Sequence, residues 1–243
     1  MKETYDSLIQ AIKDYFRKNN ISKAVVGLSG GIDSSLSARL VADAIGKGNV
    51  HGIMMPVKGL SSEENVNDAT EFCRLIEISN DLIYINDFIE GFEKFEWQSR
   101  IARMNAASRI RAVILYHYAN THKALVIGTS NKTEIMLGYF TKYGDGAVDI
   151  EVISDLFKTD EVELAKYLKL PEKIINKTPT AELYHGQTDE EELGATYKEI
   201  DDILKKIDKK QQIDENNPLA KRILKMMKDN EHKNKGPFLV KIS

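Results

Sequence analysis

The chain reads Ala24-Val25-Val26-Gly27-Leu28-Ser29-Gly30-Gly31-Ile32-Asp33-Ser34-Ser35 over residues 24–35, and this stretch decides its fold. The apolar run is typical of a strand buried on both faces of a parallel sheet. The glycines that follow let a backbone turn approach an anion, and the start of the next helix favours negative charge. Serine hydroxyls add donors, and Asp33 can hold a magnesium ion among phosphates. The stretch therefore predicts a phosphate-binding loop.

This loop differs from two common nucleotide-binding motifs. It lacks the Gly-Lys-Ser/Thr ending of a Walker A loop, and it does not follow the GxGxxG dinucleotide pattern. A glycine turn capped by serines, without any ligand, is the alternative interpretation. Seven residues in this order, directly after a buried strand, favour phosphate binding over that alternative.

Strands alternate with helices along the first three quarters of the chain. Further strands are expected at 50–55, 82–85 and 124–128, and helices at about 5–19, 36–45, 61–76 and 99–118. This alternation predicts an α/β fold, with a parallel sheet covered by helices on both faces, and ligands beyond the carboxyl ends of the strands. We expect one domain over residues 1–243. Its nucleotide-binding core would span about 20–180, followed by a mainly helical part from about 182.

Composition excludes several classes of protein. The 243 residues carry a formal net charge of -3, which argues against broad nucleic-acid binding. No apolar run reaches membrane-spanning length, and the first residues do not resemble a signal peptide, so a cytoplasmic protein is expected. Cys73 is the only cysteine, which rules out an internal disulfide or a CxxC site. Its place in a helical pattern predicts a buried side chain.

The phosphate loop resembles that of the PP-loop, or N-type, ATP pyrophosphatases, whose signature is Ser-Gly-Gly-Xaa-Asp-Ser. Later motifs are similar to those of the NAD synthetases within that superfamily: Gly128–Glu134, Gly138–Gly146, Asp155–Thr159, Lys177–Ala181, Gly186–Gly194 and Glu231–Lys233. The resemblance implies an adenine nucleotide alpha hydrolase-like, Rossmann-like fold. It also implies that ATP adenylates the carboxylate of deamido-NAD, after which ammonia displaces AMP to give NAD.

The resemblance assigns a role to each matched residue. Asp33 and Glu134 would bind Mg²⁺, and Asp33 and Lys158 would be catalytic. ATP contacts are implied at Gly27, Leu28, Ser29, Gly30, Gly31, Ile32, Asp33, Ser34, Thr129, Lys158 and Thr180. Deamido-NAD contacts are implied at Arg109, Lys142, Asp149, His232 and Lys233. Because Arg103 and Arg111 share the helix of Arg109, a neighbouring arginine stays an alternative there.

Other points of the resemblance concern the tail, the partners and the nitrogen source. The polar segment at His232-Lys233 is expected to order over bound substrate and to exclude water from the acyl-adenylate. The family implies a homodimer. Glutamine-using members carry an amidase domain with its own cysteine nucleophile, so free ammonia is expected here, with a separate ammonia-supplying protein left open. Glu182 and Tyr184 depart from the glycine and tryptophan that the family often carries.

Two other functions remain as alternatives. One is a different PP-loop pyrophosphatase, amidating or tRNA-thiolating, which the single cysteine and the acidic charge disfavour. The other is a non-catalytic module that binds an adenine nucleotide. Asp33, Glu134 and Lys158 argue against that module, because adenine binding alone requires none of them.

Overall fold

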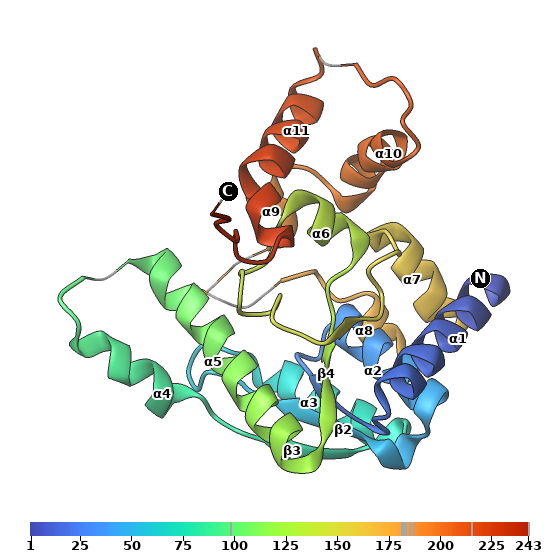
Figure 1. Cartoon of the computed structure of the whole chain (residues 1–243), viewed down its shortest axis with the longest axis vertical. Helices are drawn as coiled ribbons and strands as arrows, with labels where there is room; N and C mark the ends of the chain where they lie inside the picture. The colour runs from blue at the N-terminus through green and yellow to red at the C-terminus, as the bar shows by residue number, and fades with distance from the viewer. Residues whose placement is uncertain (98, 181–183, 185, 187, 215, 243) are drawn as a thin grey trace.

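The computed structural model describes residues 1–97, 99–180, 184, 186, 188–214 and 216–242. Over these residues, five parallel strands form one sheet in the order β3-β2-β1-β4-β5 (Figure 1). The strands are β1 Lys23–Gly27, β2 Val50–Met54, β3 Ser79–Leu82, β4 Ala124–Gly128 and β5 Ile150–Glu151. The expected parallel α/β sheet is therefore confirmed, with β1 and its phosphate loop at the centre.

Helices cover both faces of the sheet, because successive strand residues point to opposite sides. Val26 packs on one side with the first three long helices and α7, while Val25 packs on the other side with α5. The first group is α1 Lys2–Asn19, α2 Ile32–Ile45, α3 Glu63–Leu75, α7 Lys158–Tyr167 and the short α8 Glu172–Ile175. The second is α4 Asn86–Glu90, η2 Gly91–Lys94 and α5 Arg100–His122. Cys73 is buried, as expected.

A separate apolar cluster joins the C-terminal helices to the α/β core. Phe157 and Leu137 from the core meet Leu193, Leu204 and Ile223 from the helices that follow. The C-terminal helices are α9 Asp189–Leu193, α10 Tyr197–Asp208, α11 Pro218–Asn230 and η3 Glu231–Asn234. In the core, α6 Lys132–Leu137 follows β4, and the short η1 Lys47–Asn49 follows α2. Helices α10 and α11 stand at the top of Figure 1. The exact boundary near residue 182 stays a prediction, since residues 181–183 lie outside the described ranges.

Asp201 on α10 ties the C-terminal helices to the loops of the sheet. Its fully buried carboxylate accepts hydrogen bonds from the Thr133 hydroxyl at 2.5 Å and from the Thr159 backbone N–H at 2.8 Å. The same Thr133 oxygen accepts the Lys158 backbone N–H at 3.0 Å. One carboxylate thus joins α10 to the first turns of α6 and α7.

Several expected boundaries were wrong. The N-cap of α3 is Ser62, whose hydroxyl accepts the Glu64 N–H, whereas the Ser61 hydroxyl accepts the Val57 N–H. The third strand ends at Leu82, because pairing with β2 stops there. In the mainly helical part, Gly194 with a φ of 73° ends α9, so α9 and α10 are separate helices. The two-residue β5 was not predicted, since it is too short to show a pattern.

None of the described helices combines the length and the apolar character that crossing a bilayer requires.

We predict that Asp201→Ala lowers the free energy of unfolding by about 3 kcal/mol, because it leaves one buried and one partly buried donor without this acceptor. Asp202→Ala is the matched control: its exposed carboxylate pairs with exposed Lys198, and such pairs contribute about 0–1 kcal/mol. Urea unfolding of both variants measures the difference. Equal losses would contradict a fastening role for Asp201.

Glu151 on the edge strand β5 predicts a pH dependence of stability. Burial raises the pKa of this carboxyl from 4.5 to about 7, although the Ser130 N–H donates to it at 3.0 Å. Between those two values the folded state binds the extra proton, so its stability falls as pH rises through 7. Glu151→Gln should therefore gain up to about 3 kcal/mol relative to the parent between pH 5 and pH 8. Parallel stability–pH curves would contradict this prediction.

Candidate functional site

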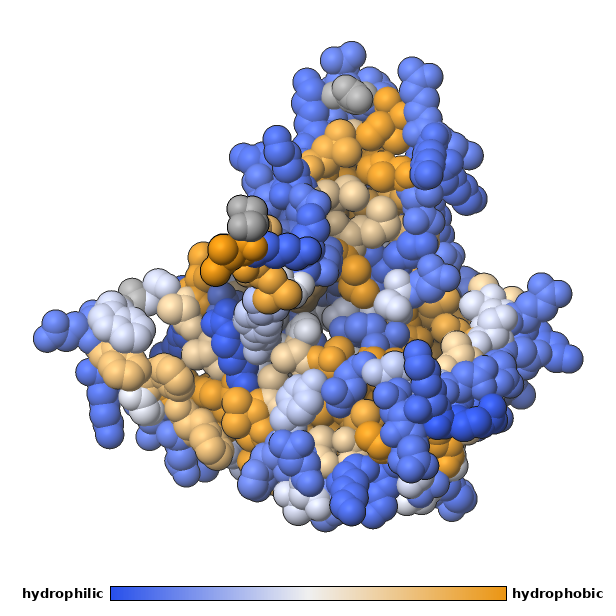
Figure 2. Space-filling model, viewed as in Figure 1, coloured by the Kyte–Doolittle hydropathy of each residue, from blue (hydrophilic) through white to orange (hydrophobic). Residues whose placement is uncertain are grey.

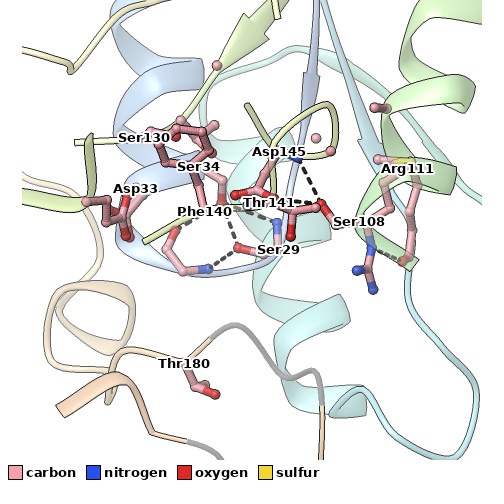
Figure 3. Close-up of a pocket in the computed structure, with 18 of the residues that line it drawn as sticks. Ser29, Asp33, Ser34, Ser108, Arg111, Ser130, Phe140, Thr141, Asp145 and Thr180 are labelled. Atoms are coloured by element: carbon pink, nitrogen blue, oxygen red, sulfur yellow. Dashed lines mark hydrogen bonds between the residues drawn. The ribbon is translucent and has the colours of Figure 1, made fainter. Parts of the chain in front are cut away.

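A cavity of about 600 Å³ opens at the carboxyl ends of the central strands, where the sequence predicted the ligand site. The loops after β1, β2 and β4 line it, together with one side of α5 and the segment that ends at Thr180. Figure 3 shows how Ser29, Asp33 and Ser34 approach it from the phosphate loop. The predicted ATP residues that line the cavity are Gly27, Leu28, Ser29, Gly31, Ile32, Asp33, Ser34, Thr129 and Thr180.

Side-chain hydroxyls hold the phosphate loop in a compact turn. The Ser34 hydroxyl accepts the Ser29 N–H at 3.2 Å, and the Ser29 hydroxyl accepts the Gly31 N–H at 3.3 Å. Gly30 has a φ of 82°, and a Cβ there would lie 2.3 Å from the backbone oxygen of Asn65. Only glycine fits at position 30, because both the conformation and the space exclude a side chain.

Lys177 fastens this loop from outside. Its ammonium, on the segment before Thr180, donates to the Gly30 carbonyl at 3.1 Å and to Asn65 at 2.5 Å. It also forms an ion pair of 2.5 Å with buried Asp68. The phosphate loop, α3 and the Thr180 segment are therefore bound together by one cation.

Asn131 places two carboxylates at the cavity. As the N-cap of α6 it forms a capping box: its side chain accepts the Glu134 N–H, and the Glu134 carboxylate accepts the Asn131 N–H at 3.1 Å. The Asn131 amide also donates to Asp33 Oδ1 at 2.8 Å. The cap that begins α6 thus holds both predicted metal ligands in the same cavity wall.

Lys158 lies directly behind Asp33. Its Nζ is 2.5 Å from Asp33 Oδ2 and 3.3 Å from the Glu161 carboxylate, and its side chain is 4% exposed. The Tyr197 ring lies 5.5 Å from the same Nζ. Lys158 does not line the cavity in this state, but it contacts Asp33, which does.

The charges in this wall depend on one another. Burial opposes ionisation of Asp33, but the positive charge of Lys158 and the hydrogen bonds to the carboxylate together outweigh it, so the pKa of Asp33 lies below its usual value. Burial, together with the charge of Asp33, raises the pKa of Glu134 well above its usual value. Burial also raises the pKa of Glu161. Three carboxyl groups, those of Asp33, Glu134 and Glu161, thus surround the ammonium of Lys158. A site with this excess of acidic groups is suited to binding an added cation.

The other wall is a loop folded against α5. The Ser108 hydroxyl donates to Asp145 at 2.6 Å and accepts the Asp145 N–H at 2.8 Å, as Figure 3 shows. Gly144 makes this approach possible, because a Cβ there would lie 2.2 Å from the Ser108 hydroxyl. These contacts fix residues 138–146 over the cavity.

Four of the five predicted deamido-NAD residues are linked to one another, whereas Asp149 has other partners. Lys233 lines the cavity and donates to the carbonyls of Gly138 and Phe140. Lys142 donates to the His232 carbonyl, and Arg109 donates to the Lys142 carbonyl at 3.3 Å. Asp149 accepts the Tyr116 hydroxyl and the Val126 N–H, so its carboxylate has partners within the fold. The substrate roles of all five stay predictions.

Sequence reasoning missed some residues that shape the site. Asn131 could have been found, because Asn131 and Glu134 have capping-box spacing. Lys177 and Asp189 fall within two of the matched motifs, but neither was given a role, since their contacts appear only on folding. Asp189 lines the cavity while 6% exposed, and it accepts the Tyr197 hydroxyl at 3.1 Å. The departure at Glu182, and the motif positions Ala181 and Gln187, lie outside the described residues; Tyr184 donates to Glu192.

Comparison with known proteins gives consistent results. The model of the NAD synthase family matches residues 4–237. The NH(3)-dependent NAD(+) synthetase of Fusobacterium nucleatum is 42% identical, over 100% of this chain and 96% of that protein. The NMN synthetase of Francisella tularensis superposes with a TM-score of 0.90 at 34% identity, covering 99% and 98% of the two chains. The NH3-dependent NAD synthetase of Campylobacter jejuni superposes at 0.84 with 31% identity and the same coverage.

The family model matches nearly the whole chain, including the phosphate loop and the residues Asp33, Glu134 and Lys158 at the cavity. This chain therefore belongs to the NAD synthase family.

Proposed function

We propose that this chain makes NAD from deamido-NAD, ATP and ammonia, and that it releases AMP and pyrophosphate. One observation carries the proposal. In a chain with full-length similarity to an NH(3)-dependent NAD(+) synthetase, the phosphate loop, Thr129, Glu134 and Thr180 line a single cavity. Nothing in this arrangement requires glutamine: Cys73 is buried, and burial raises its thiol pKa to about 11, which keeps it from acting as a nucleophile.

The proposed reaction has two steps. A carboxylate oxygen of deamido-NAD attacks the α-phosphorus of ATP, pyrophosphate leaves, and an acyl-adenylate forms. Ammonia then attacks the carbonyl carbon, and AMP leaves with the carboxylate oxygen that attacked. The amides and hydroxyls of the phosphate loop would bind the departing phosphates. Lys158 would add an ammonium close to them once Asp33 takes another partner.

Magnesium fits the residues that are present. Asp33 and Glu134 offer two carboxylates held by one asparagine, and hard oxygen donors of this kind suit Mg²⁺. No group of three or more acidic, histidine or cysteine residues able to hold a metal occurs in the described ranges. Two carboxylates with substrate phosphates are a common set for this ion. When bound, it would neutralise phosphate charge and favour departure of pyrophosphate.

A second candidate substrate comes from the Francisella relative, which is named for NMN, a mononucleotide, and not for NAD. The same adenylation and amidation would then act on nicotinate mononucleotide. The ratio of kcat/KM for the two acids decides between these substrates. A cytoplasmic location belongs to the proposal as well, because a buried unpaired cysteine suits a reducing compartment.

We also propose a homodimer, formed through an apolar face on α4, η2 and α5. Trp97 is 73% exposed and Val113 69%, and they flank a groove lined by Phe88, Phe92 and Phe95. Apolar side chains over this region are visible at the left of Figure 2. Large exposed apolar patches usually mark interaction surfaces. Arg109 lines the same groove, so a second copy would lie beside one of the predicted deamido-NAD contacts.

The amidation is tested by mixing the protein with ATP, Mg²⁺, ammonium and deamido-NAD at mildly alkaline pH. NAD, AMP and pyrophosphate should form in equal amounts, and removing the metal with EDTA should abolish all three. In parallel reactions, nicotinate mononucleotide replaces deamido-NAD. Formation of ADP in place of AMP, or no amide from either acid, would contradict the proposal.

The dimer is tested by light scattering after gel filtration. The parent should elute at twice its chain mass of 27.5 kDa, while Val113→Glu should be monomeric, because a charge in an apolar interface is costly. Leu75→Glu is the matched control, since Leu75 is 60% exposed but lies on α3, away from the groove. A monomeric parent, or a dimeric Val113→Glu variant, would rule out this interface.

A further inference from the structure

Glu161 is a buried acid for which neither the fold nor the proposed chemistry gives an evident use. It lies in the first turn of α7, three residues after Lys158, with no exposed surface. Among the residues that the structure describes, neither of its carboxylate oxygens has a hydrogen-bond partner of ordinary geometry, and the charged groups of Asp33 and Lys158 are its neighbours. Its ion-pair contact is with Lys158 Nζ at 3.3 Å. A buried carboxyl with so few contacts is unfavourable, so it calls for an explanation.

Glu161 does not contact a substrate directly. The residues that line the cavity include Asp33 and Glu134 but not Glu161. Glu161 approaches Lys158 from within the core, whereas Asp33 approaches the same ammonium from the cavity wall. Lys158 therefore lies between the carboxyl group of Glu161, inside the core, and the carboxylate of Asp33, in the cavity wall.

The carboxylate of Asp33 has two competing partners. Asp33 is bound to Lys158 at 2.5 Å, yet the proposed function also requires Asp33 to bind magnesium. A magnesium ion on Asp33 would weaken its attraction for Lys158. A buried ammonium without an anion is strongly unfavourable. Unless a second carboxylate is at hand, Lys158 would therefore oppose binding of the metal.

We propose that Glu161 is a positioning residue that keeps Lys158 paired when Asp33 binds the metal, and so holds the ammonium beneath the phosphate loop for ATP. This inference rests on the proposed function for the roles of Asp33 and Lys158. Glu161 acts through Lys158, and its own side chain stays in the core.

The test compares Glu161→Gln with the parent and with Glu163→Gln. Glutamine keeps the shape of the side chain and removes its charge. Glu163 lies on the same helix and forms an exposed pair with Lys166, which makes it the matched control. Isothermal titration measures ATP binding over a range of Mg²⁺ concentrations, without deamido-NAD, and thermal unfolding is followed without any ligand.

In Glu161→Gln, the Mg²⁺ concentration that gives half-maximal ATP binding should rise about 10-fold, as is usual when a residue supporting a metal site is removed. The melting temperature should stay the same or rise, because Lys158 keeps Asp33 as its partner. Glu161→Asp, which keeps the charge, should restore part of the metal response, and Glu163→Gln should behave as the parent.

An unchanged Mg²⁺ requirement in Glu161→Gln would overturn the inference, whether or not the melting temperature falls. The readout is independent of amidation. If the parent binds ATP with Mg²⁺ but forms no amide, the proposed function fails, while the titration still decides the role of Glu161.

Discussion

The site depends on the carboxylate of Asp33, on which three parts of the chain converge. Asp33 follows β1, Asn131 follows β4, and Lys158 begins α7 beyond β5, and the side chains of the last two bond the two oxygens of the first. Parallel strands make this possible, because their carboxyl ends meet at one edge of the sheet. The order of the strands in the sheet therefore brings residues that are distant in sequence into one wall of the cavity.

The electrostatics follow from this convergence. Asp33, Glu134 and Glu161 lie around Lys158, and burial, together with the charge of Asp33, raises the pKa values of Glu134 and Glu161. A structure selected for stability alone would not keep such a cluster, since buried ionic groups are often neutral or unfavourable for folding. Binding of a cation with a polyphosphate is a chemical reason to retain it. Asp201 and Lys177 then provide the rigid support, from α10 and from the Thr180 segment.

The sequence was informative wherever a pattern was local. The strand before Ser29 and the phosphate loop are continuous in the chain, and the fold class follows from the alternation of elements. Contacts that depend on how the elements pack could not be predicted from the sequence. Examples are Lys177 with Gly30, Asp201 with Thr133, and the Glu161–Lys158 pair behind Asp33. At Asp149, a role implied by the family resemblance differs from what the fold shows. The family resemblance gives Asp149 a substrate role, whereas the fold gives its carboxylate two internal partners.

In the proposed reaction, ATP bound at the phosphate loop is cleaved between the α- and β-phosphates, because the substrate carboxylate forms an acyl-adenylate. Deamido-NAD labelled with ¹⁸O in its carboxylate tests it most directly, because the attacking oxygen leaves with the group to which it became attached. Mass spectrometry after one turnover should find one ¹⁸O atom in AMP and none in pyrophosphate. Label in inorganic phosphate, or AMP without label, would contradict adenylation of the substrate.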